Sequence, residues 1–166
     1  MRRLSLAALL IAPVLLSLPT AARAQDIGLD LGTQAPPAAV QTLDGKPANL
    51  SDFIGKGPVL VEFWATWCPN CRALEPQMQA VSKRYAGKLR VVTVAVSVNQ
   101  SPERVKAYVA KHALPGTFVF DTKGVATGAY DVPATSYIVV LDRAGKVVYT
   151  GQGREQNLDA AVRKAL

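Results

Sequence analysis

The passage from an apolar run into a pair of cysteines most constrains how this chain can fold. Residues 58–65, "PVLVEFWA", are mostly apolar strand formers with one charge, Glu62, as expected of a central strand buried on both faces. Cys68 and Cys71, the only cysteines of the chain, follow at once. Pro69 stands at what would be the first helical position, where its missing N–H has no intrahelical partner anyway. The sequence therefore predicts a buried strand, a tight turn and a helix that begins at the first cysteine.

The rest of the chain carries the signals of further regular elements. Apolar residues at helical spacing predict a helix over residues 69–86, which Gly87 would end. Ser101, followed by Pro102, has the pattern of a helix cap. The remaining segments are an extended lead-in with a hairpin turning at residues 44–45, strands over residues 89–98 and 117–121, a short helix or turn over residues 125–132, a two-strand hairpin over residues 136–153 and a closing helix over residues 155–166. This order predicts an α/β fold with a mixed sheet flanked by helices.

The N-terminus has the three-part pattern of a secretory signal peptide. A positively charged start precedes an apolar run over residues 4–18, and an A-x-A cleavage site ends at Ala24. An uncleaved membrane anchor is the alternative, but a proline interrupts the run, which is shorter than the about 20 residues that a spanning helix needs. The sequence therefore predicts a signal peptide over residues 1–24 and one domain over residues 25–166, in the periplasm or otherwise outside the cytoplasm.

The formal net charge of +7 gives little support to nucleic acid as a partner. The leader holds three arginines and no acids, so residues 25–166 retain +4, which is 7 less 3. With one histidine and no lysine-rich run, this part lacks the basic stripe of a nucleic-acid-binding protein. The sequence predicts no nucleic-acid binding.

Four kinds of site compete for Cys68 and Cys71. A structural zinc site needs four ligands, and the chain adds only His112 to the two thiols. That histidine is expected to be a solvated residue near a helix end. A structural disulfide across so short a loop removes little chain entropy. A redox-active dithiol and a two-thiolate copper(I) site remain, because soft thiolates also select copper(I).

The redox interpretation has a mechanism in the local sequence. A thiol at the start of a helix faces unpaired N–H groups and the positive end of the helix dipole, which favour the thiolate. We therefore expect Cys68 to be the exposed nucleophile that attacks a partner's disulfide. Cys71, on the same helical face and one turn inward, would attack the mixed disulfide and release the reduced partner. Both cysteines are catalytic in this prediction, which includes no metal and no cofactor.

Glu62 is the third candidate catalytic residue. It is the sole charge of residues 58–65, and a buried ionised carboxylate is costly without a partner. Its place six residues before Cys68 could set it beneath the start of the helix. The hypothesis is that Glu62 exchanges a proton with Cys71 during resolution, with burial raising its pKa toward neutrality. The alternative is a carboxylate that points to a sheet edge or pairs with a lysine.

The stretch "FWATWCPNC" resembles the active site of the thioredoxin superfamily. The wider pattern resembles its exported TlpA/ResA/CcmG-like branch, through the lead-in over residues 32–71, the helix and strand inserted over residues 101–121, "AYDV" and "DRAGKVVYTGQG". The resemblance implies a thioredoxin-like fold with an N-terminal extension and that inserted helix and strand. It gives Cys68 the attacking role and Cys71 the resolving role, and it puts Glu62 where thioredoxins have a buried acid.

The resemblance also implies a surface on which a partner docks. Trp67 matches the aromatic residue that flanks the attacking cysteine and shapes that surface. The family places a cis-proline opposite the cysteines, but the ungapped register puts Thr135 and Ser136 there, and using Pro133 instead needs a three-residue shift. Because a non-proline cis bond costs about 2.5 to 4 kcal/mol, we expect a trans bond between Thr135 and Ser136 and a docking loop of different shape.

By the same resemblance, the expected activity is extracytoplasmic thiol–disulfide exchange in the reducing direction. Its partners would be oxidised thiol proteins, such as apocytochrome c during cytochrome c maturation or copper-site assembly proteins, with electrons from a membrane protein of the DsbD/CcdA kind. A copper(I) carrier that uses the same thiolates and a peroxiredoxin-like antioxidant are the alternatives. The peroxiredoxin motif P-x-x-x-[TS]-x-x-C meets Val61 and Ala65 where it needs Pro and then Thr or Ser.

Overall fold

The computed structural model describes residues 28–166, so the predicted signal peptide and its cleavage site lie outside the described residues. Seven strands, four α-helices and a short 3-10 helix follow one another in this part of the chain. Their bounds are β1 Ala39–Thr42, β2 Pro47–Asn49, η1 Leu50–Phe53, β3 Val59–Trp64, α1 Pro69–Arg84, β4 Arg90–Val96, α2 Pro102–His112, β5 Thr117–Asp121, α3 Val125–Ala129, β6 Tyr137–Leu141, β7 Val147–Gln152 and α4 Leu158–Arg163. None of these helices is long and apolar enough to span a membrane.

The strands form one mixed sheet in the order β2-β1-β5-β4-β3-β6-β7. β3, β4 and β5 run parallel to one another, whereas β6, β7, β1 and β2 join by antiparallel pairing. The hairpin of β1 and β2 turns at the predicted residues 44–45 and continues the sheet beyond β5, the inserted strand. The predicted α/β fold with a mixed sheet is confirmed.

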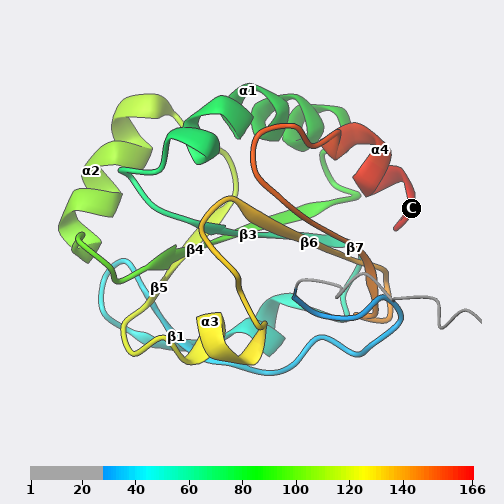
Figure 1. The fold of residues 1–166 in the computed structure, drawn as a ribbon, viewed down its shortest axis with the longest axis horizontal. Helices are drawn as coiled ribbons and strands as arrows, with labels where there is room; N and C mark the ends of the chain where they lie inside the picture. The colour runs from blue at the N-terminus through cyan, green and yellow to red at the C-terminus, as the bar shows by residue number, and fades with distance from the viewer. Residues whose placement is uncertain (1–27) are drawn as a thin grey trace, which may run out of the picture.

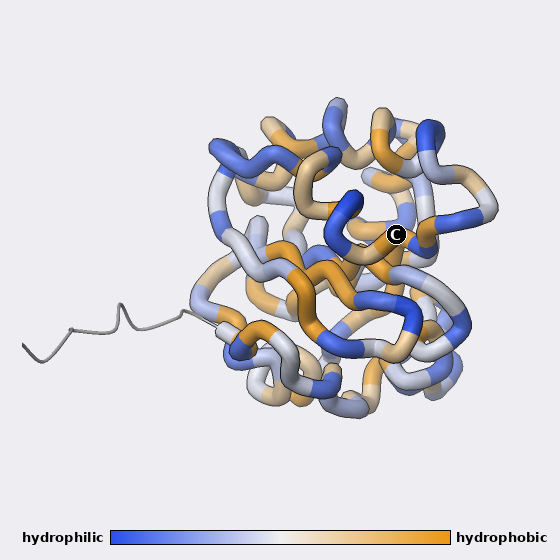
Figure 2. Tube along the Cα trace, turned by 90° about the vertical axis from the view of Figure 1, so that its right-hand side faces the viewer, coloured by the Kyte–Doolittle hydropathy of each residue, from blue (hydrophilic) through white to orange (hydrophobic). Residues whose placement is uncertain are grey.

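Helices cover both faces of the sheet, with α1, α2 and α4 above it and α3 below it in Figure 1. Side chains of β3 alternate between these two layers. Val61 and Phe63 pack in the cluster that holds residues of α3, while Leu60 and Trp64 pack in the clusters that hold residues of α1. Figure 2 shows hydrophobic segments crossing the middle of the molecule between hydrophilic outer turns. β3 is therefore buried on both faces, as predicted.

The helix that carries the cysteines is close to its predicted extent. α1 begins at Pro69 and ends at Arg84, two residues before the predicted end. Leu74, Met78 and Val81 form its buried face, and fully burying such a side chain contributes roughly 1.5 to 3 kcal/mol. This packing fixes α1 on the sheet and so fixes the position of its first turn.

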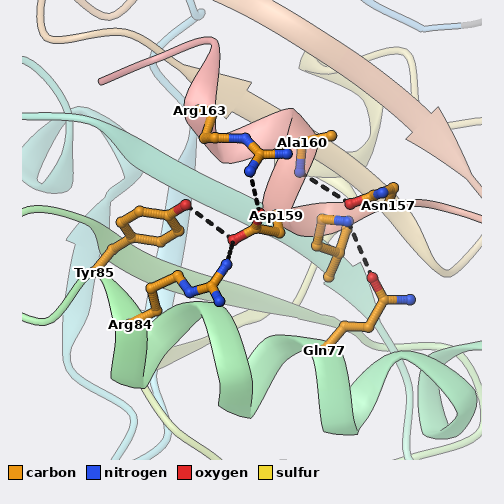
Figure 3. A network of polar contacts seen from close by, with 8 residues as sticks. Gln77, Arg84, Tyr85, Asn157, Asp159, Ala160 and Arg163 are labelled. Carbon is orange, nitrogen blue, oxygen red and sulfur yellow. Dashed lines mark hydrogen bonds and ion pairs between the residues drawn. The ribbon is translucent and has the colours of Figure 1, made fainter.

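Polar contacts hold α4 against α1 (Figure 3). Asp159 accepts hydrogen bonds from Arg84 Nη1 at 2.6 Å and Tyr85 Oη at 2.9 Å, and it pairs with Arg163 Nη1 at 2.9 Å. Gln77 Oε1 accepts from the backbone N–H of Leu158 at 3.0 Å. Asp159 is thus an ionised side chain with a full set of donors at the surface.

Candidate active site at the start of α1

The first turn of α1 brings the two cysteines together. Cys68 is the N-cap residue, with extended backbone, and Pro69 occupies the first helical position. The backbone N–H of Cys71 donates to Cys68 Sγ at 3.1 Å, and the two residues form a disulfide. In the reduced state the N–H groups of the first turn of α1, together with the helix dipole, favour a thiolate on Cys68. The predicted pair at a helix start is therefore the geometry that the chain adopts.

Cys68 is buried, and the expectation that it is exposed is wrong for this disulfide form. Its exposed fraction is 2%, and that of Cys71 is 1%. Both cysteines pack in one hydrophobic cluster, whose buried members also include Trp64, Ala95 and Phe120. The sequence shows the helix start but not this cover, which comes from strands distant in the chain. The 2% exposure describes the disulfide form, in which Cys68 Sγ is already bonded to Cys71 Sγ.

Trp67 and Thr135, both predicted to dock the partner, line one cavity beside the cysteines. The cavity has a volume of about 280 Å³, and its wall also includes Pro133 and Ala134. Trp67 is 38% exposed, and its Nε1 donates to the carbonyl oxygen of Val98 at 2.7 Å, which fixes the indole at this cavity. The structure therefore brings these two docking candidates to a concave surface next to Cys68.

Ser136 has a different place from Thr135. It is fully buried with a φ of +65°, a conformation uncommon for a non-glycine residue. Its N–H donates to the carbonyl of Phe63 at 2.8 Å, its Oγ accepts from the N–H of Gly153 at 3.1 Å, and its carbonyl accepts from Gln156 Nε2 at 3.2 Å. These contacts fasten the loop to β3 and to the segment before α4, so Ser136 presents no exposed atom to a partner.

Every peptide bond in the described part of the chain is trans. This includes the bond between Thr135 and Ser136, as predicted, and the bond before Pro133. The shifted register that would give Pro133 the cis-proline role therefore finds no cis bond to support it.

Glu62 lies in the middle of β3 and is 4% exposed. Thr93 of β4 and Ile138 of β6 are its cross-strand neighbours, so the alternative of a sheet edge is wrong. Among residues 28–166 no lysine or arginine pairs with it, and its Oε1 has no hydrogen-bond partner. Burial, and then the nearby negative charge of Glu75, raise the pKa of Glu62 to about 8.

The alternation of β3 puts Glu62 on the side of the sheet that α1 covers. Leu60 and Trp64, two residues to either side, pack with residues of α1, and Trp64 shares its cluster with Cys71. A carboxyl group with raised proton affinity thus lies beneath the helix that carries the resolving cysteine. Glu62 and Cys71 thus lie on the same side of the sheet, as the hypothesis of proton exchange between them requires.

Asp121, at the end of β5, shows how a buried carboxylate is ordinarily accommodated. It is fully buried, but it accepts from the N–H of Ala126 at 3.2 Å and from the N–H and Oγ1 of Thr127 at 2.8 and 2.7 Å. The two N–H groups belong to the first turn of α3, and together with the Thr127 hydroxyl they replace the lost water around the carboxylate. Glu62 has no such donors on Oε1, so its burial calls for a functional explanation.

Sequence reasoning missed a second polar group near the cysteines. Glu75 stands four residues after Cys71 on α1, and it accepts from Tyr108 Oη at 2.9 Å. His112, expected to be solvated, is stacked on Tyr108 and lies 3.4 Å from Glu75. The spacing of Cys71 and Glu75 places them on one helical face, a signal visible in the sequence. Nothing local indicates the two residues of α2.

Metal ligands are sparse around the thiols. Within residues 28–166, no group of three or more His, Cys, Asp or Glu side chains lies close enough to hold a metal ion. The arrangement that the described chain does supply is a dithiol at a helix start above a buried acid. This is the site of a thiol–disulfide oxidoreductase with a thioredoxin-like fold.

Comparison with known proteins agrees with that class. The Redoxin family model matches residues 13–166. The chain is similar to the thioredoxin-like protein YneN of Bacillus subtilis, with 35% identity over 142 residues that cover 81% of this chain and 82% of YneN. It is also similar to the thiol-disulfide oxidoreductase ResA of Bacillus anthracis, with 30% identity over 138 residues, 82% of this chain and 79% of ResA.

Solved structures also share the fold of this chain. A crystal structure described as a thiol:disulfide interchange protein DsbE from Chlorobium tepidum superposes with a TM-score of 0.68 and 30% identity, over 82% of this chain and 95% of that one. A conserved protein from Geobacillus kaustophilus shares the fold with a TM-score of 0.72 at 24% identity, over 82% of each chain. The chain belongs to the Redoxin family and is a TlpA/ResA/CcmG-like thiol–disulfide oxidoreductase of the thioredoxin superfamily.

Proposed function

We propose that the protein reduces disulfides of exported partners outside the cytoplasm, with Cys68 as nucleophile, Cys71 as resolving cysteine and Glu62 as the proton acceptor. The observation that carries this proposal is the Cys68–Cys71 pair on the first turn of α1, on the side of the sheet where Glu62 is buried with Oε1 unpartnered. The signal-peptide pattern of residues 1–24 supports the location.

The reaction has two exchange steps. The thiolate of Cys68 attacks one sulfur of the partner's disulfide, which forms a mixed disulfide and releases the other sulfur as a thiolate. Cys71 then gives its proton to Glu62 and attacks Cys68 Sγ, which forms the Cys68–Cys71 disulfide and breaks the mixed one. The partner gains two electrons, and its two thiolates take up protons from solvent or from Glu62. The cysteine pair loses these two electrons and ends the cycle as the Cys68–Cys71 disulfide.

Each turnover requires an external dithiol to reduce the pair again. A membrane electron-transfer protein of the DsbD/CcdA kind fits this role, because each turnover leaves the Cys68–Cys71 pair as a disulfide that only a further thiol–disulfide exchange returns to the dithiol. Oxidised apocytochrome c and copper-site assembly proteins are the partners that we propose. Trp67 and Thr135 would receive them at the 280 Å³ cavity beside the cysteines.

Partner trapping tests the two cysteine roles. In a Cys71→Ser variant the mixed disulfide cannot resolve, so exported partners should accumulate covalently on Cys68 and dissociate only with added reductant. The matched control is Cys68→Ser, which should trap none. Equal trapping by both variants would contradict the assignment of nucleophile and resolving cysteine.

The equilibrium reduction potential of the metal-free protein tests the direction. A value near the −270 mV typical of thioredoxin would agree with a reductase, because a low potential drives electrons from the dithiol to the partner. A value near about −120 mV, typical of the oxidant DsbA, would show that the protein oxidises its partners instead.

A further inference from the structure

The residues directly before Cys68 form a tight turn. The backbone N–H of Cys68 donates to the carbonyl oxygen of Ala65 at 3.1 Å. This bond closes a turn whose central residues are Thr66 and Trp67. Cys68 is the last residue of the turn and also the N-cap of α1, where its Sγ lies 3.1 Å from the backbone nitrogen of Cys71. The geometry of the turn therefore decides where Cys68 Sγ lies relative to the donors of the helix.

The segment between β4 and α2 fastens both central residues of this turn. Gln100 Oε1 accepts from the backbone N–H of Thr66 at 2.9 Å. The other end of the same amide, Gln100 Nε2, donates to the carbonyl oxygen of Val96, the last residue of β4. The carbonyl oxygen of Val98 accepts from Trp67 Nε1 at 2.7 Å. One amide side chain thus ties the end of β4 to the turn that precedes the nucleophilic cysteine.

The backbone of this segment explains how it meets the turn. Asn99 has a φ of +53°, in the left-handed region that asparagine tolerates better than most residues. Because Asn99 stands between Val98 and Gln100, it bends the chain where these two residues reach the turn. Ser101 then caps α2 by accepting from the N–H of Arg104 at 3.3 Å. Gln100 is therefore held between the end of a strand and the start of a helix.

The side chain of Thr66 adds no polar anchor of its own. Thr66 is 4% exposed, and its Oγ1 has no hydrogen-bond partner among the described residues. Gln100 supplies the acceptor for the N–H of this buried residue. Removing that acceptor leaves a buried donor unpaired, which is unfavourable enough to shift the backbone toward another partner. The position of the turn therefore depends on Gln100.

We propose that Gln100 is a positioning residue of the exchange reaction, because it holds the turn that keeps Cys68 Sγ on the N–H groups of α1. The inference rests on the proposed role of Cys68 as nucleophile. A hydrogen bond to a thiolate is charge-assisted and stronger than one to the neutral sulfur of a disulfide. A correctly placed turn thus stabilises the reduced protein more than the oxidised one, and Gln100 acts on the redox equilibrium through the turn.

The sign of the effect follows from that difference. Displacing the turn costs the dithiol form more than the disulfide form, so the disulfide should become harder to reduce and the reduction potential more negative. A loss of stability that both redox forms share equally leaves the equilibrium between them unchanged. The redox equilibrium therefore separates a positioning role from a merely structural one.

Gln100→Met tests the inference, because methionine has a similar length but no amide oxygen to accept from Thr66. The metal-free protein is equilibrated with mixtures of reduced and oxidised glutathione, and the dithiol fraction is measured. We expect the equilibrium constant to move toward the disulfide by about three- to tenfold, which corresponds to about 15 to 30 mV. Gln100→Asn, which keeps an amide but shortens the side chain, should shift the equilibrium in the same direction by less.

Gln34→Met is the control. Gln34 Nε2 donates to the carbonyl oxygens of Ala144 and Gly145 at 3.0 and 3.2 Å, in the turn that joins β6 to β7. That turn lies at the end of β3 away from the cysteines, since Leu141 pairs with Val59. The control also loses hydrogen bonds from an amide to the backbone, but it should keep the wild-type redox equilibrium even where its stability falls.

The trapping of partners by Cys71→Ser separates this inference from the proposed function. If both Gln100 variants keep the wild-type equilibrium, or shift it no more than Gln34→Met does, while Cys71→Ser still traps partners on Cys68, the inference is overturned and the proposed function stands. If Cys71→Ser traps no partner through Cys68, the role of Cys68 as nucleophile fails, and this inference fails with it.

Discussion

Two carboxyl groups next to α1 differ in almost every respect. Asp159 lies at the surface with two arginines and the hydroxyl of Tyr85 around it, and the hydrogen bond and charge of Arg84 hold its pKa below the usual range. Glu62 lies in the sheet beneath the helix, has no partner for Oε1 and has a pKa raised to about 8. The first group is ionised and ties α4 to α1, whereas the second is kept protonated at neutral pH.

The difference separates a paired acid at the surface from a buried acid whose Oε1 has no partner. An ionised surface carboxylate with donors costs the fold little, and it contributes little because solvent screens it. A buried carboxyl group without a partner makes the folded state less stable as soon as the unfolded chain can ionise. Stability alone does not explain a buried carboxyl group whose Oε1 has no partner, which is why we propose a role for Glu62 in the exchange reaction.

Replacing Glu62 should give the largest change in stability. Below its ordinary pKa of 4.5 the carboxyl group is protonated whether the chain is folded or not, so it has no pH-linked effect. Between 4.5 and about 8 only the unfolded chain ionises, so the stability of the wild type falls with rising pH and the loss is complete above about 8. We expect Glu62→Leu to be more stable than the wild type by on the order of 3 kcal/mol at neutral pH.

Denaturant unfolding of the oxidised protein at acidic and alkaline pH measures this effect. The advantage of Glu62→Leu should be small near pH 4.5 and should grow toward about pH 8.5. An advantage that is the same at both pH values would mean that the carboxyl group does not carry a raised pKa in the folded state.

Gln156 offers an intermediate effect on the loop that holds Thr135 and Ser136. It is 9% exposed, and its Nε2 donates to the carbonyls of Ser136 and Gly153 at 3.2 and 2.7 Å. Gln156→Ala leaves the buried carbonyl of Ser136 without this donor, at a cost of about 1 to 3 kcal/mol in the free energy of unfolding. Amide hydrogen exchange at Ser136 should quicken as well, because the loop loses an anchor.

Gln79→Ala is the control for that substitution, since Gln79 is exposed on α1. It should leave both the stability and the exchange rate of Ser136 unchanged. A Gln156→Ala protein as stable as this control would show that the other contacts of Ser136 suffice to hold the loop.

Asp159→Asn should have the smallest effect. The neutral amide loses the charge that pairs with Arg84 and Arg163, so the denaturation midpoint should fall slightly at neutral pH. Because the pKa of Asp159 is lowered in the folded state, its contribution is present above its ordinary pKa of 3.8 and is lost as the pH falls further. The difference from the wild type should also shrink in 1 M salt, since these charges are screened; a difference independent of salt would point to altered packing.

Local signals predicted the frame of the active site well. The apolar run of β3, Pro69 at the first helical position and the cap at Ser101 each act within a few residues, and the structure has β3, α1 and α2 there. Glu62 stood out because one charge interrupts a buried run. The strand is apolar on both faces, however, so the sequence could not show that α1 covers the face of Glu62.

Features built from distant segments were not predictable in the same way. The burial of Cys68 depends on β4 and β5, and the fastening of Ser136 depends on Gly153 and Gln156. The contact of Tyr108 with Glu75 joins residues 33 positions apart on two helices. Each is a consequence of tertiary packing, which spacing within one element does not encode.

The pH dependence of the resolution step in the wild type and in Glu62→Gln tests the account most directly. The wild-type rate should rise with a midpoint near pH 8, and the variant should resolve roughly a hundredfold more slowly without that midpoint, because an amide cannot accept the proton of Cys71. A variant that keeps both the rate and the midpoint of the wild type would show that the buried carboxyl group takes no part in the exchange.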